Sequence, residues 1–177
     1  YEEVAQVLAD PRLKLSGDAY LAQQEMLVNI EQTIADIHCS VEMMKDLRAQ
    51  MEILAERLGK LGTQTSLVTK AQAITEQINT WERQLIQPEQ KTFQDVINFP
   101  NRLNAELLNL HSRCDGIDPR VTSGAEERLA DLTAEWQSLA EERDLIIFNE
   151  MAAFNKLYSE QQLPALFLPD STSGTAW

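Results

Sequence analysis

The fold is decided by one uninterrupted stretch, residues 27–58, LVNIEQTIADIHCSVEMMKDLRAQMEILAERL. It contains neither glycine nor proline, and its apolar residues return at alternating steps of three and four, with one irregular step. These residues are Leu27, Ile30, Ile34, Ile37, Val41, Met44, Leu47, Met51, Leu54 and Leu58. Such spacing places them along one face of a helix, as in a coiled coil. We therefore predict a helix over residues 18–58, about 60 Å long at 1.5 Å per residue.

Three further helices are predicted from the same alternation, over residues 66–86, 101–115 and 123–161. Their apolar seams are Leu67, Ala71, Ile74, Ile78, Trp81 and Leu85 in the first, Leu103, Leu107, Leu110 and Cys114 in the second, and Leu129, Leu132, Trp136 and Leu139 in the third. Glycine or proline, which punctuate helices, stand between or beside these ranges. They are Gly59, Gly62, Pro88, Pro100, Gly116, Pro119 and Pro164.

The helix lengths favour one arrangement. Helices 66–86 and 101–115, with the interruption between them, span about the length of either long helix. We therefore predict an all-α fold, an elongated antiparallel up-down-up bundle of three rods whose middle rod is broken near residues 87–100. The apolar residues of the interruption are expected to pack inward; they are Phe93, Val96, Ile97 and Phe99.

The predicted domain organisation has three parts. Residues 1–15 form an extended lead-in from an upstream domain, because an Asp-Pro step within them disfavours helix. Residues 16–166 form the helical bundle, and residues 167–177 a flexible tail. The first residue, Tyr1, is not methionine, and no signal peptide follows it, so we expect the chain to be part of a longer protein.

Composition excludes several classes of protein. The 177 residues include 15 Lys and Arg against 28 Asp and Glu, a net charge of −13, with only 6 Gly and 6 Pro. So few turn-forming residues argue against an all-β sandwich or barrel. No apolar run is long enough to span a membrane, and no basic stripe indicates nucleic-acid binding. We interpret the acidic excess as the solvated exterior of the helices. The alternative is that it binds a specific cationic partner.

Residues for catalysis or metal binding are scarce. The chain has two histidines and two cysteines, with no CxxC, HExxH, GxSxG, Walker A or GxGxxG motif. His38 and Glu42 share a helix face, but a structural pair is the stronger interpretation. His38 and Cys39 point about 100° apart on a helix, which does not make a catalytic pair. We predict no catalytic, cofactor-binding or metal-binding residue and no cofactor, and we expect Cys39 and Cys114 to be free thiols because the bundle separates them.

A few residues break the seams or stand out on them. Arg143 and Glu150 occupy positions of the last helix where apolar residues are expected, either at the edge of a shifted apolar face or as a structural polar pair that sets register. Trp81 and Trp136 are predicted to be in the core. Trp177 lies in the predicted tail.

Several short motifs resemble a known family. They are Asp10-Pro11-Arg12, Leu47-Arg48-Ala49-Gln50, Asn98-Phe99-Pro100-Asn101-Arg102-Leu103-Asn104, Phe154-Asn155 and Leu163-Pro164-Ala165. Together they resemble the C-terminal helical region of large bacterial BNR-repeat, sortilin-like β-propeller proteins that are labelled as glycosyl hydrolases. The resemblance extends from about residue 7 to residue 166.

The resemblance implies that propellers precede these helices and carry any glycosidase-like activity, so no catalytic residue is carried over to this chain. It implies a structural motif at the break of the middle rod, with Arg102 and Asn104 satisfying open backbone groups there; the motif is Phe99, Pro100, Arg102, Leu103 and Asn104. It also implies a periplasmic or secreted location.

Two functions therefore remain. The leading hypothesis is a non-enzymatic accessory module that packs on an upstream propeller or β-sandwich domain of the same chain, binds another protein, or self-associates. The alternative is a free-standing sensory or partner-binding bundle. Neither involves nucleic acid or a membrane span.

Overall fold

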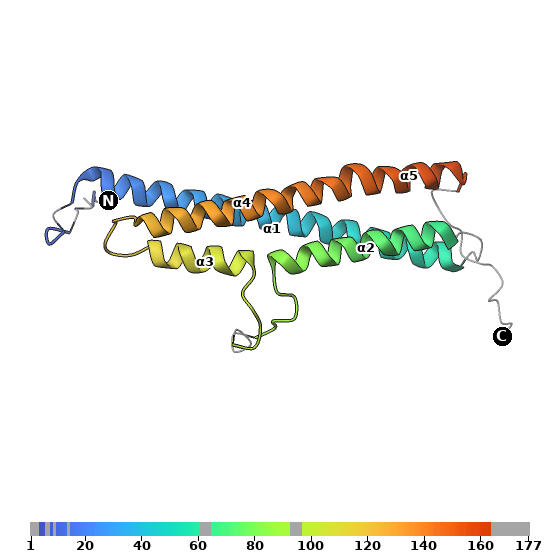
Figure 1. Ribbon diagram of the computed structural model, residues 1–177, viewed down its shortest axis with the longest axis horizontal. Coiled ribbons are helices and arrows are strands. Elements are labelled where there is room, and N and C mark those ends of the chain that lie inside the picture. Colours follow the sequence, from blue (N-terminus) through green and yellow to red (C-terminus); the bar gives the residue numbers. More distant parts are fainter. Residues whose placement is uncertain are drawn as a thin grey trace. The chain divides into compact units, whose positions relative to one another are not determined.

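A computed structural model describes residues 4–5, 8, 10–13, 15–60, 65–92 and 97–163. Within these ranges the chain is helical and has no β-strand, so the prediction of an all-α fold is confirmed. The elements are α1 (Gly17–Lys60), α2 (Thr65–Leu85), α3 (Leu103–Cys114), α4 (Ser123–Leu145), a π-helical turn η2 (Ile146–Glu150) and α5 (Met151–Glu160) (Figure 1). The four predicted helices match α1, α2, α3 and the run from α4 to α5, to within about two residues at each end.

The chain divides into two compact units. The first comprises Tyr1–Cys39 and Leu85–Gln137, and the second Ser40–Gln84 and Ser138–Trp177. Helices α1 and α4 each contribute a segment to both units. The middle helix of the first unit is α3, and that of the second is α2, so the predicted break of the middle rod separates two helices that belong to different units.

In the first unit, three hydrogen bonds show that α1 and α3 are antiparallel. Gln23 Nε2 donates to the Cys114 carbonyl at 2.8 Å, and His111 Nε2 lies 3.0 Å from Glu31 Oε1. Farther along α1, His38 Nε2 lies 3.0 Å from Oδ1 of Asn104, near the start of α3. Arg128 Nη2 of α4 donates to Glu106 of α3 at 3.2 Å. The buried core is Met26, Ile30, Ile37, Leu85, Leu103, Leu107, Leu110, Leu132 and Trp136.

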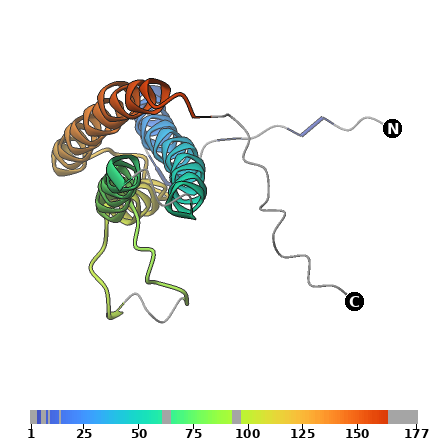
Figure 2. The same cartoon turned by 90° about the vertical axis from the view of Figure 1, so that its right-hand side faces the viewer.

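The described part of the connection before α3 extends away from the helices of the first unit (Figure 2). Ile97 is 91% exposed there, and Phe99 is half-buried. The expectation that Ile97 packs inward is therefore wrong. An apolar residue in a segment without helical periodicity has no helix face to direct it to the core, and here the backbone leads it into solvent. Phe93 and Val96 lie outside the described residues.

In the second unit, α2 runs antiparallel to the segment from α4 to α5. The indole Nε1 of Trp81, late in α2, donates to the Leu139 carbonyl at 2.7 Å, whereas Lys70, early in α2, pairs with Glu150. The buried core is Val41, Met44, Met51, Leu58, Leu67, Ala71, Ile74, Ile78, Trp81, Leu139, Ile146 and Phe154. The predicted burial of Trp81 here and of Trp136 in the first unit is confirmed.

The π-helical turn resets the apolar face at the end of the second unit. Met151 N–H bonds to the Ile146 carbonyl, five residues back, so this turn holds one residue more than an α-helical turn. Continuing the steps of three and four from Ile146 places the exposed Ala153 on the core side. With one residue inserted, Phe154 takes that place and is 2% exposed. The shifted apolar face that was one interpretation of the last helix thus has a cause in the backbone.

Candidate functional site

The residues of the predicted structural motif lie at the start of α3. Phe99 is half-buried, Pro100 is exposed, and Leu103, the first residue of α3, is buried. Arg102 occupies the N-cap position with φ −112° and ψ 172°. The Asn104 side chain binds His38 on α1, with Oδ1 3.0 Å from Nε2.

The capping role expected of Arg102 is not observed, because its side chain makes no cap hydrogen bond. A guanidinium has only donors, whereas the first turn of a helix presents free N–H groups that need an acceptor. The Nε atom of Arg102 is buried without a partner. With Asn101 and Asn104, Arg102 lines a hollow of about 430 Å³.

The residues considered for catalysis or metal binding are dispersed. His38 binds Asn104, and Glu42 pairs instead with Lys45 at 3.0 Å. No group of three or more His, Cys, Asp or Glu in the described ranges could hold a metal ion. Cys39 and Cys114 are free, as predicted. Burial raises the pKa of the Cys114 thiol, which lies 3.9 Å from the Met26 sulfur.

The two polar residues that interrupt the last helix are both paired. Arg143 Nη1 donates to Ser40 Oγ of α1 at 2.7 Å and also binds Asp144. Glu150 pairs with Lys70 of α2. Among these contacts Arg143 and Glu150 each have a different partner, so they do not show the structural polar pair that was one interpretation of the two residues.

A third polar cluster of the second unit was missed from the sequence. Arg48 Nη1 binds Glu82 and donates to Asn79 Oδ1 at 2.7 Å, and Glu82 is only 5% exposed. The signal was present in the one irregular step of the first seam. A step of four from Met44 leads to Arg48, where the alternation requires an apolar residue.

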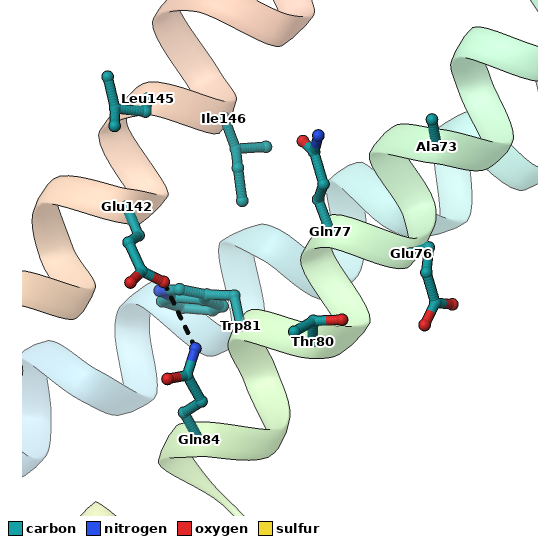
Figure 3. A pocket seen from close by; sticks show the side chains of 9 residues that line it. All are labelled: Ala73, Glu76, Gln77, Thr80, Trp81, Gln84, Glu142, Leu145 and Ile146. Atoms are coloured by element: carbon teal, nitrogen blue, oxygen red, sulfur yellow. Dashed lines mark hydrogen bonds between the residues drawn. The ribbon is translucent and has the colours of Figure 1, made fainter.

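One concave feature of the second unit lies between α2 and α4 (Figure 3). This hollow of about 550 Å³ is lined by Ala73, Glu76, Gln77, Thr80, Trp81, Gln84, Glu142, Leu145 and Ile146. Trp81 extends from α2 toward α4, and its indole is held by the Leu139 carbonyl. Leu145 is 57% exposed. The hollow therefore offers apolar surface to solvent.

A second hollow continues the first toward the start of α2. It measures about 610 Å³ and is lined by Ser66, Thr69, Lys70, Ala73 and Leu157. Ala73 lines both hollows, so the two adjoin along α2. We call the two together the α2–α4 groove. From Ser66 to Gln84 it follows about 27 Å of α2, at 1.5 Å per residue.

The charges of the α2–α4 groove are mainly acidic. Glu76 lies on the α2 wall and Glu142 on the α4 wall. Gln84 Nε2 lies 3.4 Å from Glu142 Oε2, so that a neutral donor faces this carboxylate. Lys70 is paired with Glu150. Neither lining carboxylate has a cation among the described ion pairs.

The chain matches no protein-family model, no curated protein and no solved structure. None of the helices in the described part of the chain has both the length and the apolar character needed to cross a membrane.

Proposed function

We propose that this chain is a non-enzymatic interaction module that binds an apolar helix of a protein partner. The observation that carries the proposal is the α2–α4 groove, an open channel to which Trp81, Leu145 and Ile146 contribute apolar surface. Concave sites that combine apolar side chains with a few polar groups are typical of ligand and partner binding.

The dimensions of the groove suit a helix. Recognition of a helix in a groove between two helices uses an apolar stripe on the guest, with anchors three or four residues apart. A groove length of about 27 Å accommodates a helix of about 18 residues. Ala73 at the junction of the two hollows has no side chain beyond Cβ, so a guest helix can approach the α2 backbone closely there.

The chemistry of the lining also favours binding. No histidine or cysteine occurs among the residues that line the groove. Its polar groups are amides, hydroxyls, one ion-paired lysine and two carboxylates on opposite walls. These groups can orient a guest by hydrogen bonds, and the apolar floor supplies the burial that makes binding favourable.

The biological context of this module is the one implied by the resemblance of residues 98–104. We propose that it is an accessory region of a bacterial BNR-repeat, sortilin-like protein outside the cytoplasm. Its partner is then an upstream propeller or β-sandwich domain of the same protein, or a second protein. Any glycosidase-like activity belongs to the propellers.

The test uses a fluorescein-labelled 18-residue peptide of leucine and glutamine, with leucine at the spacing of one helix face. Binding is followed by fluorescence anisotropy. We expect saturable binding that Ala73→Arg abolishes, because arginine fills the junction of the two hollows. Thr80→Arg, also in the lining, is a second blocking variant in case the first does not fold, and the thermal melt of each is measured by circular dichroism. Equal affinity for the parent chain and a folded blocked variant refutes the proposal.

A matching test addresses catalysis. We expect no hydrolysis when the chain is incubated with a panel of glycans and the products are separated by chromatography. Clear turnover that survives repeated purification contradicts the non-enzymatic assignment.

A further inference from the structure

We infer that the helix bound in the α2–α4 groove is basic, with lysine or arginine on both edges of its apolar stripe. This inference rests on the proposed function and adds the charge and spacing of the partner. Two carboxylates line the groove, that of Glu76 from α2 and that of Glu142 from α4.

Among the residues that the structure describes, no ion pair includes Glu76 or Glu142. Lys70 lines the second hollow, and its ammonium is held by Glu150 of η2. The donor that reaches Glu142 is the neutral amide of Gln84. A guest with basic edges therefore supplies the charge that the lining lacks, and a neutral guest does not.

The net charge opposes a second copy of this chain as the occupant. The chain carries −13, and two copies meeting at this groove would bring the same acidic rims together. Like charges placed face to face destabilise an interface and slow its formation. A basic helix is instead attracted by both the local carboxylates and the long-range field.

The positions of the two carboxylates set the spacing of the basic residues. Glu142 is level with Gln84, which it faces at 3.4 Å. Glu76 precedes Gln84 by eight residues on α2, which is about 12 Å along the groove. Two residues of a guest helix eight apart are separated by the same 12 Å and by about 80° around its axis. They lie on the two edges of an apolar stripe, as the opposite walls require.

Three peptides with the same leucine positions test the inference. Their polar positions are all glutamine, all lysine or all glutamate. In 50 mM salt we expect the lysine peptide to bind about fivefold more tightly than the glutamine peptide, the effect of two exposed ion pairs, and the glutamate peptide to bind more weakly. At 500 mM salt the difference should largely disappear because exposed charges are screened.

Two matched double variants distinguish the effect of the groove carboxylates on peptide binding from the effect of the net charge of the chain. Glu76→Gln with Glu142→Gln should reduce the preference for lysine to the part that the long-range field of the chain supplies. Glu52→Gln with Glu127→Gln changes the net charge equally at two exposed residues outside the groove and should preserve the preference. If the control pair lowers it as much as the groove pair, attraction is merely long-range and the inference is overturned.

The remaining outcomes distinguish the inference from the function on which it rests. If lysine and glutamine peptides bind equally and Ala73→Arg abolishes both, the groove binds helices but the charge assignment is wrong. If no peptide binds at 100 µM, both proposals fail. If the chain sediments as a dimer that Ala73→Arg converts to a monomer, the occupant is a second copy and the basic partner is excluded.

Discussion

The cluster of Arg48, Glu82 and Asn79 allows a quantitative test of how polar residues are held inside the second unit. The Glu82 side chain is 7% exposed and that of Arg48 23%. Removing one partner of a buried ion pair costs about 3–5 kcal/mol, because the other charge stays buried without compensation, whereas replacing both with apolar residues is often nearly neutral.

The two single substitutions should differ. Arg48→Met leaves an almost fully buried carboxylate without its cation, and we expect a loss of about 4 kcal/mol. Glu82→Leu leaves a guanidinium that keeps its 2.7 Å bond to Asn79 and some access to water, so the expected loss is nearer to about 3 kcal/mol. The double variant should lie within about 1 kcal/mol of the parent, because no buried charge remains.

Urea unfolding followed by circular dichroism measures these differences. With a slope of about 2 kcal/mol per M, the single variants should lower the midpoint by roughly 2 M and 1.5 M. The loss of stability of the double variant is then smaller than the sum of the two single losses by a coupling energy of about 6 kcal/mol. If the losses are simply additive, Arg48 and Glu82 do not act as a buried pair and the reasoning is refuted.

Three further predictions concern single sites. Iodoacetamide at pH 8 should modify exposed Cys39 faster than Cys114, whose pKa burial raises; equal rates by intact mass contradict this. Phe154→Ala should reduce the unfolding free energy in urea by about 3–5 kcal/mol, since the ring is 2% exposed, and a loss below 1 kcal/mol argues against its place in the core. Arg102→Met should leave the melting temperature unchanged or raised, because it keeps the stem and removes an unpaired buried Nε; a marked decrease means that the guanidinium has a stabilising role.

The helices of this protein could be predicted from sequence because their signal is local. Residues Ile30, Ile37, Met44, Met51 and Leu58 recur every seven positions along α1, and all are at most 2% exposed. Their periodicity reports the helix on which they lie, independently of what packs against it. Glycine and proline mark the ends for the same reason, since their backbone preferences act on their immediate neighbours.

The candidate site could not be predicted in the same way. Ala73, Glu76 and Thr80 are ordinary surface residues in the sequence of α2, and Leu145 looks like one more apolar residue of α4. They line one groove only because α2 packs antiparallel to the segment from α4 to α5 in a particular register. The partners of Arg48, Arg143 and Glu150 depend on that register too.

The sequence by itself therefore determined where each helix runs and which face of it is apolar, because those properties follow from a repeat of three or four residues. The tertiary structure alone decided which helix faces which, how the π-helical turn moves Phe154 into the core, and where two walls leave an open groove. Those properties depend on the packing of side chains far apart in the sequence, such as Arg48 and Glu82, 34 residues apart, or Ser40 and Arg143, 103 residues apart. No local pattern specifies that packing.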